Sequence, residues 1–374
     1  MKTLSDALSG AVRSPELRTL AETSGLVATV YLTTRGDVEN AADVSDQRWR
    51  VLRSQLLEQG ADEATLDRVD PLIASAHEHG PCLAVIASAQ GLLHVEHGSE
   101  APPGDFGCWD ALPVLGLLIQ WRQSSPPYVV VVTDRRGADI TVVGRRTTPV
   151  THTVEGGDDL PIRKVAQGGW SQHRYQQRAE NTWESHARQI ADDVQRASGE
   201  VNADIIVVAG DVRAVELLEK HLPERLVQQI EEIPGGRSSE TSDERIHDAT
   251  QRWVMTAVAR ETVALLEKFR EQRGQHDRAA DGADATLRAL SQGQVEVLLV
   301  HDDWHDTRRA WFGSAQLAVA IDQATLKNLG VSDAVSGRLV DVAIQAALRT
   351  GASVWTVPHA GGPTDGIGAI LRWG

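Results

Sequence analysis

The sequence predicts an α/β fold of three domains, each with a mixed or mainly parallel sheet and flanking helices. Two observations predict this class: short β-branched or apolar runs alternate with longer helical patterns, and 374 residues are enough for two or three domains. Hydrophobic residues make up 41% and charged residues 24% of the chain, which is the usual globular balance. The chain can therefore bury real cores.

The first expected domain covers residues 1–125. Its expected strands are 26–33, 83–88 and 91–97, and its expected helices are 46–58 and 64–78. Strands are recognised by their β-branched and apolar residues, and helices by their apolar spacing. The run Ser124-Ser125-Pro126-Pro127 is typical of a linker and predicts the boundary.

The second expected domain covers residues 126–276. Strands are expected at 128–133, 140–144 and 204–209, and helices from about Arg174, at 212–221 and at 242–275. The first two strands form a hairpin through Arg135-Arg136-Gly137. A polar, glycine-containing stretch follows at 147–169, and loops of that length are usually functional or disordered.

The third expected domain covers residues 286–374, after a polar boundary at 277–284. We expect helices at 285–291 and 333–349, and strands at 295–301, 353–357 and 367–373. The strands look apolar throughout, as in sheets that are covered on both faces.

Positive charge is concentrated in one part of an acidic chain. The net charge is −15, yet residues 135–178 hold eight Lys or Arg against four acids, and residues 161–178 contain no acid. Such a segment is typical of a phosphate-rich partner. The alternative is an ordinary solvated helix end, which is what most charge runs are.

The candidate site lies within this basic segment. Gly168 and Gly169 let the backbone turn freely, and Gln172 has no useful pKa but can orient a water and donate to a developing oxyanion. The expected RNA-binding residues are Arg163, Lys164, Trp170, His173, Arg174, Tyr175 and Arg178. The alternative is a glycine-rich turn capped by core aromatic residues.

Several other classes of protein are disfavoured. Two cysteines are too few for a disulfide framework, and no signal-peptide pattern opens the chain. No apolar run reaches the roughly 18 residues of a membrane span, and no P-loop or G-x-S-x-G motif is present. The run His301-Asp302-Asp303-Trp304-His305 suggests metal ligands, but its residues are common in loops. We expect a cytoplasmic protein with no metal, cofactor, DNA or membrane partner.

Two places in the chain resemble a known family. The run Gly169-Trp170-Ser171-Gln172 is a G-x-x-Q variant of a Gly-Gly-Gln loop, and the helix after it contains Arg174, Tyr175, Arg178, Glu180, Asn181 and Trp183. The C-terminal run Asp365-Gly366-Ile367-Gly368-Ala369-Ile370-Leu371-Arg372-Trp373 is similar to the end of the family's third domain. The chain thus resembles the bacterial branch of the archaeo-eukaryotic release factor 1 superfamily, which includes Pelota and Vms-type proteins.

The resemblance implies a three-domain, release-factor-like architecture that enters the ribosomal A site. The middle-domain loop would then face the peptidyl-transferase centre and ribosomal RNA, close to a P-site tRNA. Similarity to Balon-type factors implies ribosome hibernation together with elongation factor Tu. Two residues separate Gly169 from Gln172, and the stop-codon-reading motif has no counterpart, so stop-codon-dependent termination is not expected.

Three functions remain open at this stage. The leading one is a ribosome-binding translation factor in hibernation or rescue. The second is a peptidyl-tRNA hydrolase, a carboxylic ester hydrolase in which Gln172 orients the attacking water. The third is a cytosolic α/β protein that binds a small molecule and has no ribosomal role.

Overall fold

The computed structural model describes most of the chain as two compact units. The described residues are 15–34, 40–98, 101–134, 136–144, 149–155, 170–203, 205–237, 240–274, 278–313 and 317–373, with the side chains of 170–183 and 240–243 outside the description. The middle unit lies within residues 126–259. The terminal unit combines residues from 9–125 and 260–374. The expected division into three domains at 1–125, 126–276 and 286–374 stays a prediction.

The middle unit contains a five-stranded sheet with the order β7-β6-β5-β8-β9. Its strands are β5 (Tyr128–Thr133), β6 (Gly137–Val143), β7 (Val150–Glu155), β8 (Ile205–Gly210) and β9 (Ile230–Glu232). β5, β8 and β9 are parallel, whereas β5, β6 and β7 form an antiparallel meander. The central strands β5 and β8 are almost wholly apolar because helices cover both of their faces.

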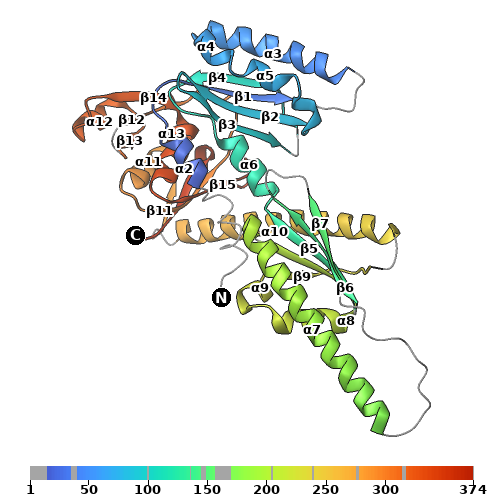
Figure 1. Ribbon diagram of the computed structural model, residues 1–374. Coiled ribbons are helices and arrows are strands. Elements are labelled where there is room, and N and C mark those ends of the chain that lie inside the picture. The colour runs from blue at the N-terminus through green and yellow to red at the C-terminus, as the bar shows by residue number, and fades with distance from the viewer. Residues whose placement is uncertain are drawn as a thin grey trace. The chain divides into compact units, whose positions relative to one another are not determined.

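Those helices are α7 (Trp170–Val201), α8 (Val212–His221) and the first part of α10 (Glu240–Gly274), with the short α9 (Glu224–Val227) beside them. Ile190 and Val194 of α7 pack with α8 against Val129 and Val131 of β5. The residues of opposite parity in the sheet pack instead against Ile246 and Val254 of α10. Because side chains alternate along a strand, one apolar run serves two cores. Figure 1 shows the sheet between these helices.

The first sheet of the terminal unit is antiparallel throughout, with the order β3-β2-β1-β4. The expectation of a mixed or mainly parallel sheet is therefore wrong for this part of the chain. The physical reason is that β2 and β3 are joined by a two-residue turn, which allows only antiparallel pairing. The strands are β1 (Val27–Thr33), β2 (Cys82–Ser88), β3 (Gly91–Gly98) and β4 (Phe106–Asp110).

Six helical segments belong to the described N-terminal part of this unit. They are α2 (Pro15–Ala21), α3 (Ala41–Glu58), α4 (Glu63–Leu66), α5 (Asp70–Ile73), the 3-10 turn η1 (Ala76–Glu78) and α6 (Gly116–Ser124). The helix expected at 64–78 is interrupted, because Pro71 fits only the first turn of a helix and α5 begins there. Trp49, Leu52 and Leu56 of α3 pack onto one face of the sheet.

The C-terminal part of the terminal unit has a mixed sheet, β10-β16-β11-β15, and a small antiparallel sheet, β13-β12-β14. The elements are β10 (Ala279–Asp281), α11 (Ala283–Ser291), β11 (Val295–Val300), β12 (Arg309–Gly313), β13 (Val319–Ala320), α12 (Gln323–Asn328), β14 (Ala334–Arg338), α13 (Leu339–Arg349), β15 (Ser353–Thr356), η2 (Thr364–Gly366) and β16 (Ile367–Leu371). The helix expected from 333 begins only at Leu339, because residues 334–338 pair with β12. The α/β class itself is confirmed.

Buried charges and aromatic rings join the two parts of the terminal unit. Trp304 stacks on Tyr31 of β1, with ring centroids 6.1 Å apart, and contacts Phe106 of β4. Arg338 lies 2.7 Å from Asp302 and donates two hydrogen bonds to Asp341. Among the helices that the structure describes, none has an apolar stretch long enough to span a bilayer.

Candidate functional site

The strands β5, β7 and β8 of the middle sheet end at the same edge, which we call the carboxyl edge. The parallel strands β5 and β8 reach it together, with Thr133 opposite Gly210. A Cβ atom at Gly210 would lie only 2.2 Å from the carbonyl oxygen of Thr133, so this close approach requires glycine. Asp211 then begins α8, accepting a hydrogen bond from the Arg213 amide.

The predicted loop leaves the sheet from this edge. β7 ends at Glu155, which pairs with Gly137 at the start of β6. The end of β7 therefore lies beside the start of β6 and the end of β5. Four of the predicted site residues, Arg163, Lys164, Gly168 and Gly169, lie outside the described residues.

Helix α7 begins at Trp170, four residues earlier than expected. Trp170, Gln172 and His173 therefore belong to the first turn of a helix, not to a flexible loop tip. The backbone of α7 also includes Arg174, Tyr175 and Arg178, and the side chains of all six residues lie outside the description. The glycine pair before Trp170 explains the start, since glycine is a poor helix former.

The start of α7 extends well beyond the carboxyl edge. His186 of α7 lines the same depression as Asp134, the residue after β5, so α7 passes the edge near His186. Gln172 precedes His186 by 14 residues on a helix of 1.5 Å per residue, which places its backbone about 21 Å further out. Figure 1 shows this projection. We call residues 170–185 the arm.

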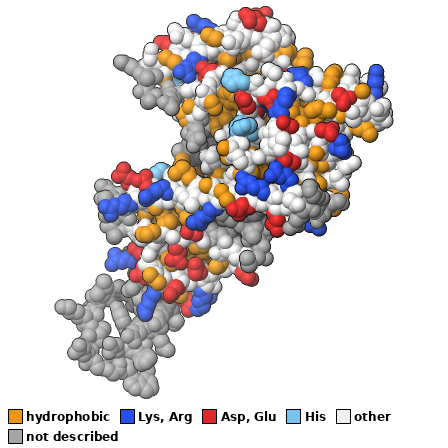
Figure 2. Space-filling view, turned by 180° about the vertical axis from the view of Figure 1, so that it is seen from behind, with side chains coloured by type: hydrophobic (Ala, Val, Ile, Leu, Met, Phe, Trp, Pro, Cys, Tyr) orange, Lys and Arg blue, Asp and Glu red, His pale blue; other side chains and the backbone are white. Residues whose placement is uncertain are grey.

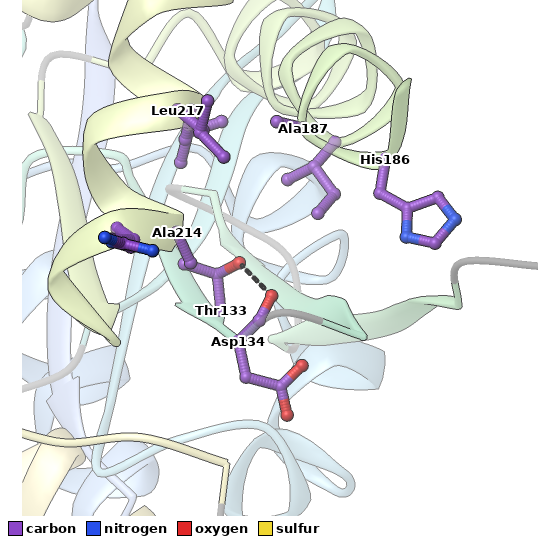
Figure 3. Close-up of a pocket in the computed structure, with 9 residues that line it drawn as sticks. Thr133, Asp134, His186, Ala187, Ala214 and Leu217 are labelled. Atoms are coloured by element: carbon purple, nitrogen blue, oxygen red, sulfur yellow. Dashed lines mark hydrogen bonds between the residues drawn. The ribbon is translucent and has the colours of Figure 1, made fainter. Parts of the chain in front are cut away.

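The depression itself is largely aliphatic. It is lined by Thr133, Asp134, His186, Ala187, Ile190, Arg213, Ala214, Leu217 and Leu218. In Figure 3, Ala187 of α7 and Leu217 of α8 face this space, whereas the His186 ring lies on the side of α7 away from α8. The described lining offers few polar groups with which to orient a polar ligand.

Charged side chains pair with one another at the base of the arm. The guanidinium of Arg237 donates from Nε to Asp139 Oδ2 at 2.8 Å and from Nη1 to Asp134 Oδ1 at 3.4 Å. Asp139 also accepts a hydrogen bond of 2.7 Å from the Thr153 hydroxyl. Burial alone would raise the pKa of Asp139, but the hydrogen bonds from Arg237 and Thr153 hold it below its ordinary value.

Sequence reasoning named none of these partners as site residues. A glycine pair, Gly235-Gly236, precedes Arg237 and signals a turn before α10. Nothing local indicates that Arg237 reaches residues about a hundred positions earlier in the chain. Figure 2 shows acidic and basic side chains interspersed on the visible face, so the positive excess is not evident among the coloured residues there.

The disfavoured metal motif has a structural role instead. His301 Nδ1 donates to the Val357 carbonyl at 3.2 Å, Asp302 pairs with Arg338, and Trp304 packs on Tyr31. Within the described ranges, no group of three His, Cys, Asp or Glu residues is arranged to hold a metal ion.

The middle of the chain matches a known family. Residues 127–275 match the model of the bacterial archaeo-eukaryotic release factor family 2. The chain is 26% identical over 369 residues, 97% of each protein, to protein Rv2629 of Mycobacterium tuberculosis H37Rv. It is 25% identical over 200 residues to eukaryotic peptide chain release factor subunit 1 of Podospora anserina, covering 51% of this chain and 45% of that protein.

A solved structure is also similar. Dom34 of S. cerevisiae, a translation termination-like factor, matches 72% of this chain and 74% of its own, with 11% identity and a TM-score of 0.41. The match of residues 127–275 to the family model confirms the predicted resemblance to bacterial archaeo-eukaryotic release factors. The narrower similarity to Balon-type factors stays a prediction.

Proposed function

We propose that this chain, whose residues 127–275 match bacterial archaeo-eukaryotic release factor family 2, is a ribosome-associated translation factor of the cytoplasm that acts in hibernation or rescue. The observation that carries the proposal is the arm. It places the backbone of Gln172 about 21 Å beyond the carboxyl edge, within a sequence segment that has no acid from 161 to 178.

An arm of this kind suits a partner whose target lies at the end of a narrow, negatively charged passage. In the ribosomal A site, the arm would reach towards the peptidyl-transferase centre and the P-site tRNA. Arg163, Lys164, His173, Arg174 and Arg178 would contact phosphates of ribosomal RNA, while Trp170 and Tyr175 would stack on bases. Delivery by elongation factor Tu is part of this hypothesis.

Co-sedimentation with idle ribosomes tests the binding. The wild type should pellet with ribosomes, and the double variant Arg174→Glu, Arg178→Glu should bind more weakly. Each lost phosphate contact should reduce the slope of log affinity against log salt by about 0.7 to 0.9. Absence of wild-type binding would refute the ribosomal role and leave the small-molecule hypothesis. Unchanged binding by the variant would remove these two residues from the interface.

The second candidate function is hydrolysis of peptidyl-tRNA, because a glutamine is retained at the start of α7. Such a glutamine would position a water and donate to the oxyanion. Ribosomes that carry labelled peptidyl-tRNA separate the two cases. Release by the wild type but not by Gln172→Ala indicates a hydrolase, and equal binding without release by either indicates an occupant that only blocks the site.

A further inference from the structure

Arg237 joins two segments of the middle unit that are distant in sequence, the β5–β6 hairpin and the segment before α10. It precedes α10, yet its guanidinium contacts Asp139 of β6 through two nitrogens, at 2.8 and 3.3 Å, and Asp134 after β5. Asp134 Oδ1 also accepts the Arg136 and Gly137 amides at 2.7 and 3.0 Å, which fixes the β5–β6 turn. The turn and the segment before α10 are therefore held together by one side chain.

The same contacts reach β7, the strand from which the chain departs towards the arm. Asp139 pairs with Thr153 in the sheet, and their side chains share a hydrogen bond of 2.7 Å. Two residues later, Glu155 ends β7 opposite Gly137. A Cβ atom at Gly137 would lie 2.1 Å from the Val154 carbonyl oxygen and 3.1 Å from Arg237 Nη1, so the three groups are packed closely.

Arg237 also compensates negative charge at this place. Asp134 and Asp139 keep 38% and 33% of their side-chain surface exposed, and Glu155 next to them is exposed as well. Uncompensated carboxylates here would repel RNA phosphates near the arm. The ion pairs of Arg237 with Asp134 and Asp139 are too exposed to contribute much to the stability of the protein, since such ion pairs contribute about 0 to 1 kcal/mol.

We propose that Arg237 is a positioning residue for the end of β7: it fixes that strand end and masks the two aspartates from the RNA that the arm approaches. This inference rests on the proposed ribosomal function for its second half. The first half concerns only the middle unit and can be measured without ribosomes.

The test compares Arg237→Ala with Arg196→Ala. Arg196 pairs with Asp193 at 2.6 Å on the part of α7 outside the arm, so both variants remove one positive charge, and they break two ion pairs and one ion pair respectively. Hydrogen exchange of the β7 amides reports the position of that strand. We expect exchange about fivefold or more faster in Arg237→Ala, unchanged exchange in β8, and no change in Arg196→Ala.

Ribosome engagement supplies the second measurement. Arg237→Ala should weaken co-sedimentation about tenfold and reduce chemical protection of RNA at the peptidyl-transferase centre, at an unchanged melting temperature. Adding Asp139→Asn to Arg237→Ala should recover most of the affinity, because it removes a repelling charge, but not the protection. Arg237→Lys, which keeps the charge but not the two-nitrogen contact, should likewise retain affinity and lose protection.

The outcomes distinguish failure of the proposed ribosomal function from failure of the role assigned to Arg237. Absence of wild-type binding to ribosomes would refute the proposed function, and hydrogen exchange would still decide whether Arg237 fixes β7. Unchanged β7 exchange in Arg237→Ala would overturn the inference, as would wild-type protection by that variant. Equal losses in Arg237→Ala and Arg196→Ala would also overturn it, because the effect would then belong to net charge alone.

Discussion

Arg338 and Arg237 each bind two aspartates, but the first cluster is buried and the second is partly exposed. Arg338 contacts Asp302 and Asp341, and the three side chains are 10%, 5% and 4% exposed. Arg237 contacts Asp134 and Asp139, and these side chains are 18%, 38% and 33% exposed. The composition of the two clusters is the same, so burial is the main difference between them.

The difference in burial reverses the direction in which the pKa of the aspartate is shifted. In the terminal unit, burial raises the pKa of Asp341 to about 6 despite the charge and hydrogen bonds of Arg338, and Asp302 adds to the rise. In the middle unit, burial is weaker and the Arg237 contacts lower the pKa of Asp139. At Asp341 the cost of removing water exceeds the stabilisation of the ionised form by Arg338, whereas at Asp139 the contacts of Arg237 outweigh that cost.

The largest expected difference between the clusters follows from removal of the arginine. Arg338→Ala leaves two buried carboxylates without their cation and should destabilise the protein by about 3 to 5 kcal/mol. Arg237→Ala should cost no more than about 1 kcal/mol. Urea unfolding of both variants measures the difference, and equal losses would refute the argument from burial.

A smaller loss is expected at the glycine that contacts the buried cluster. A Cβ atom at Gly116, the first residue of α6, would lie 1.8 Å from Asp302 Oδ2. Because Asp302 is held by Arg338, Gly116→Ala should destabilise by about 1 to 3 kcal/mol, the usual cost of overpacking. Gly199→Ala in α7, where nothing lies within 4 Å, is the control and should be neutral or stabilising in the same unfolding experiment.

The pH dependence should have opposite signs at the two clusters. The pKa of Asp341 is raised in the folded protein, so its contribution to stability is full below the unfolded pKa and is lost as pH rises through about 6. The pKa of Asp139 is lowered, so its contribution is present above the unfolded pKa and lost on acidification.

Unfolding measured between pH 3 and 7 tests these signs. The stability of Asp341→Asn relative to wild type should rise with pH, by at most about 1.4 kcal/mol per unit. The stability of Asp139→Asn relative to wild type should fall when the pH increases from 3 to 5. A parallel dependence in both variants would contradict the assignment of the shifts to burial and to pairing.

The local sequence pattern was sufficient to predict several helices and strands of the middle unit. The strand 128–133 and the helix 212–221 have the predicted bounds, and α10 differs from its prediction by two residues at the start and one at the end. These elements carry strong signals: an unbroken β-branched run, and an aspartate cap before an apolar helical spacing. The early start of α7 was missed because three of the four residues of its first turn, Ser171, Gln172 and His173, are polar and give no apolar helical spacing.

The local sequence pattern was insufficient to predict structure that depends on partners distant in the sequence. Residues 334–338 have no strand signal that outweighs the adjoining helix, and they become β14 because β12 is available to pair with them. The direction of pairing in the β3-β2-β1-β4 sheet likewise depends on connections rather than on composition. Arg237 was missed because its acceptors lie 98 and 103 residues away.

The sequence by itself determined the α/β class, the concentration of positive charge before residue 178 and the resemblance carried by Gly169 to Gln172. Each of these depends on residues that are neighbours along the chain. Only the tertiary structure decided which aspartates share an arginine, and which of those clusters is buried. Solvent access and the distance between charges set their energies, and both arise only when remote segments pack together.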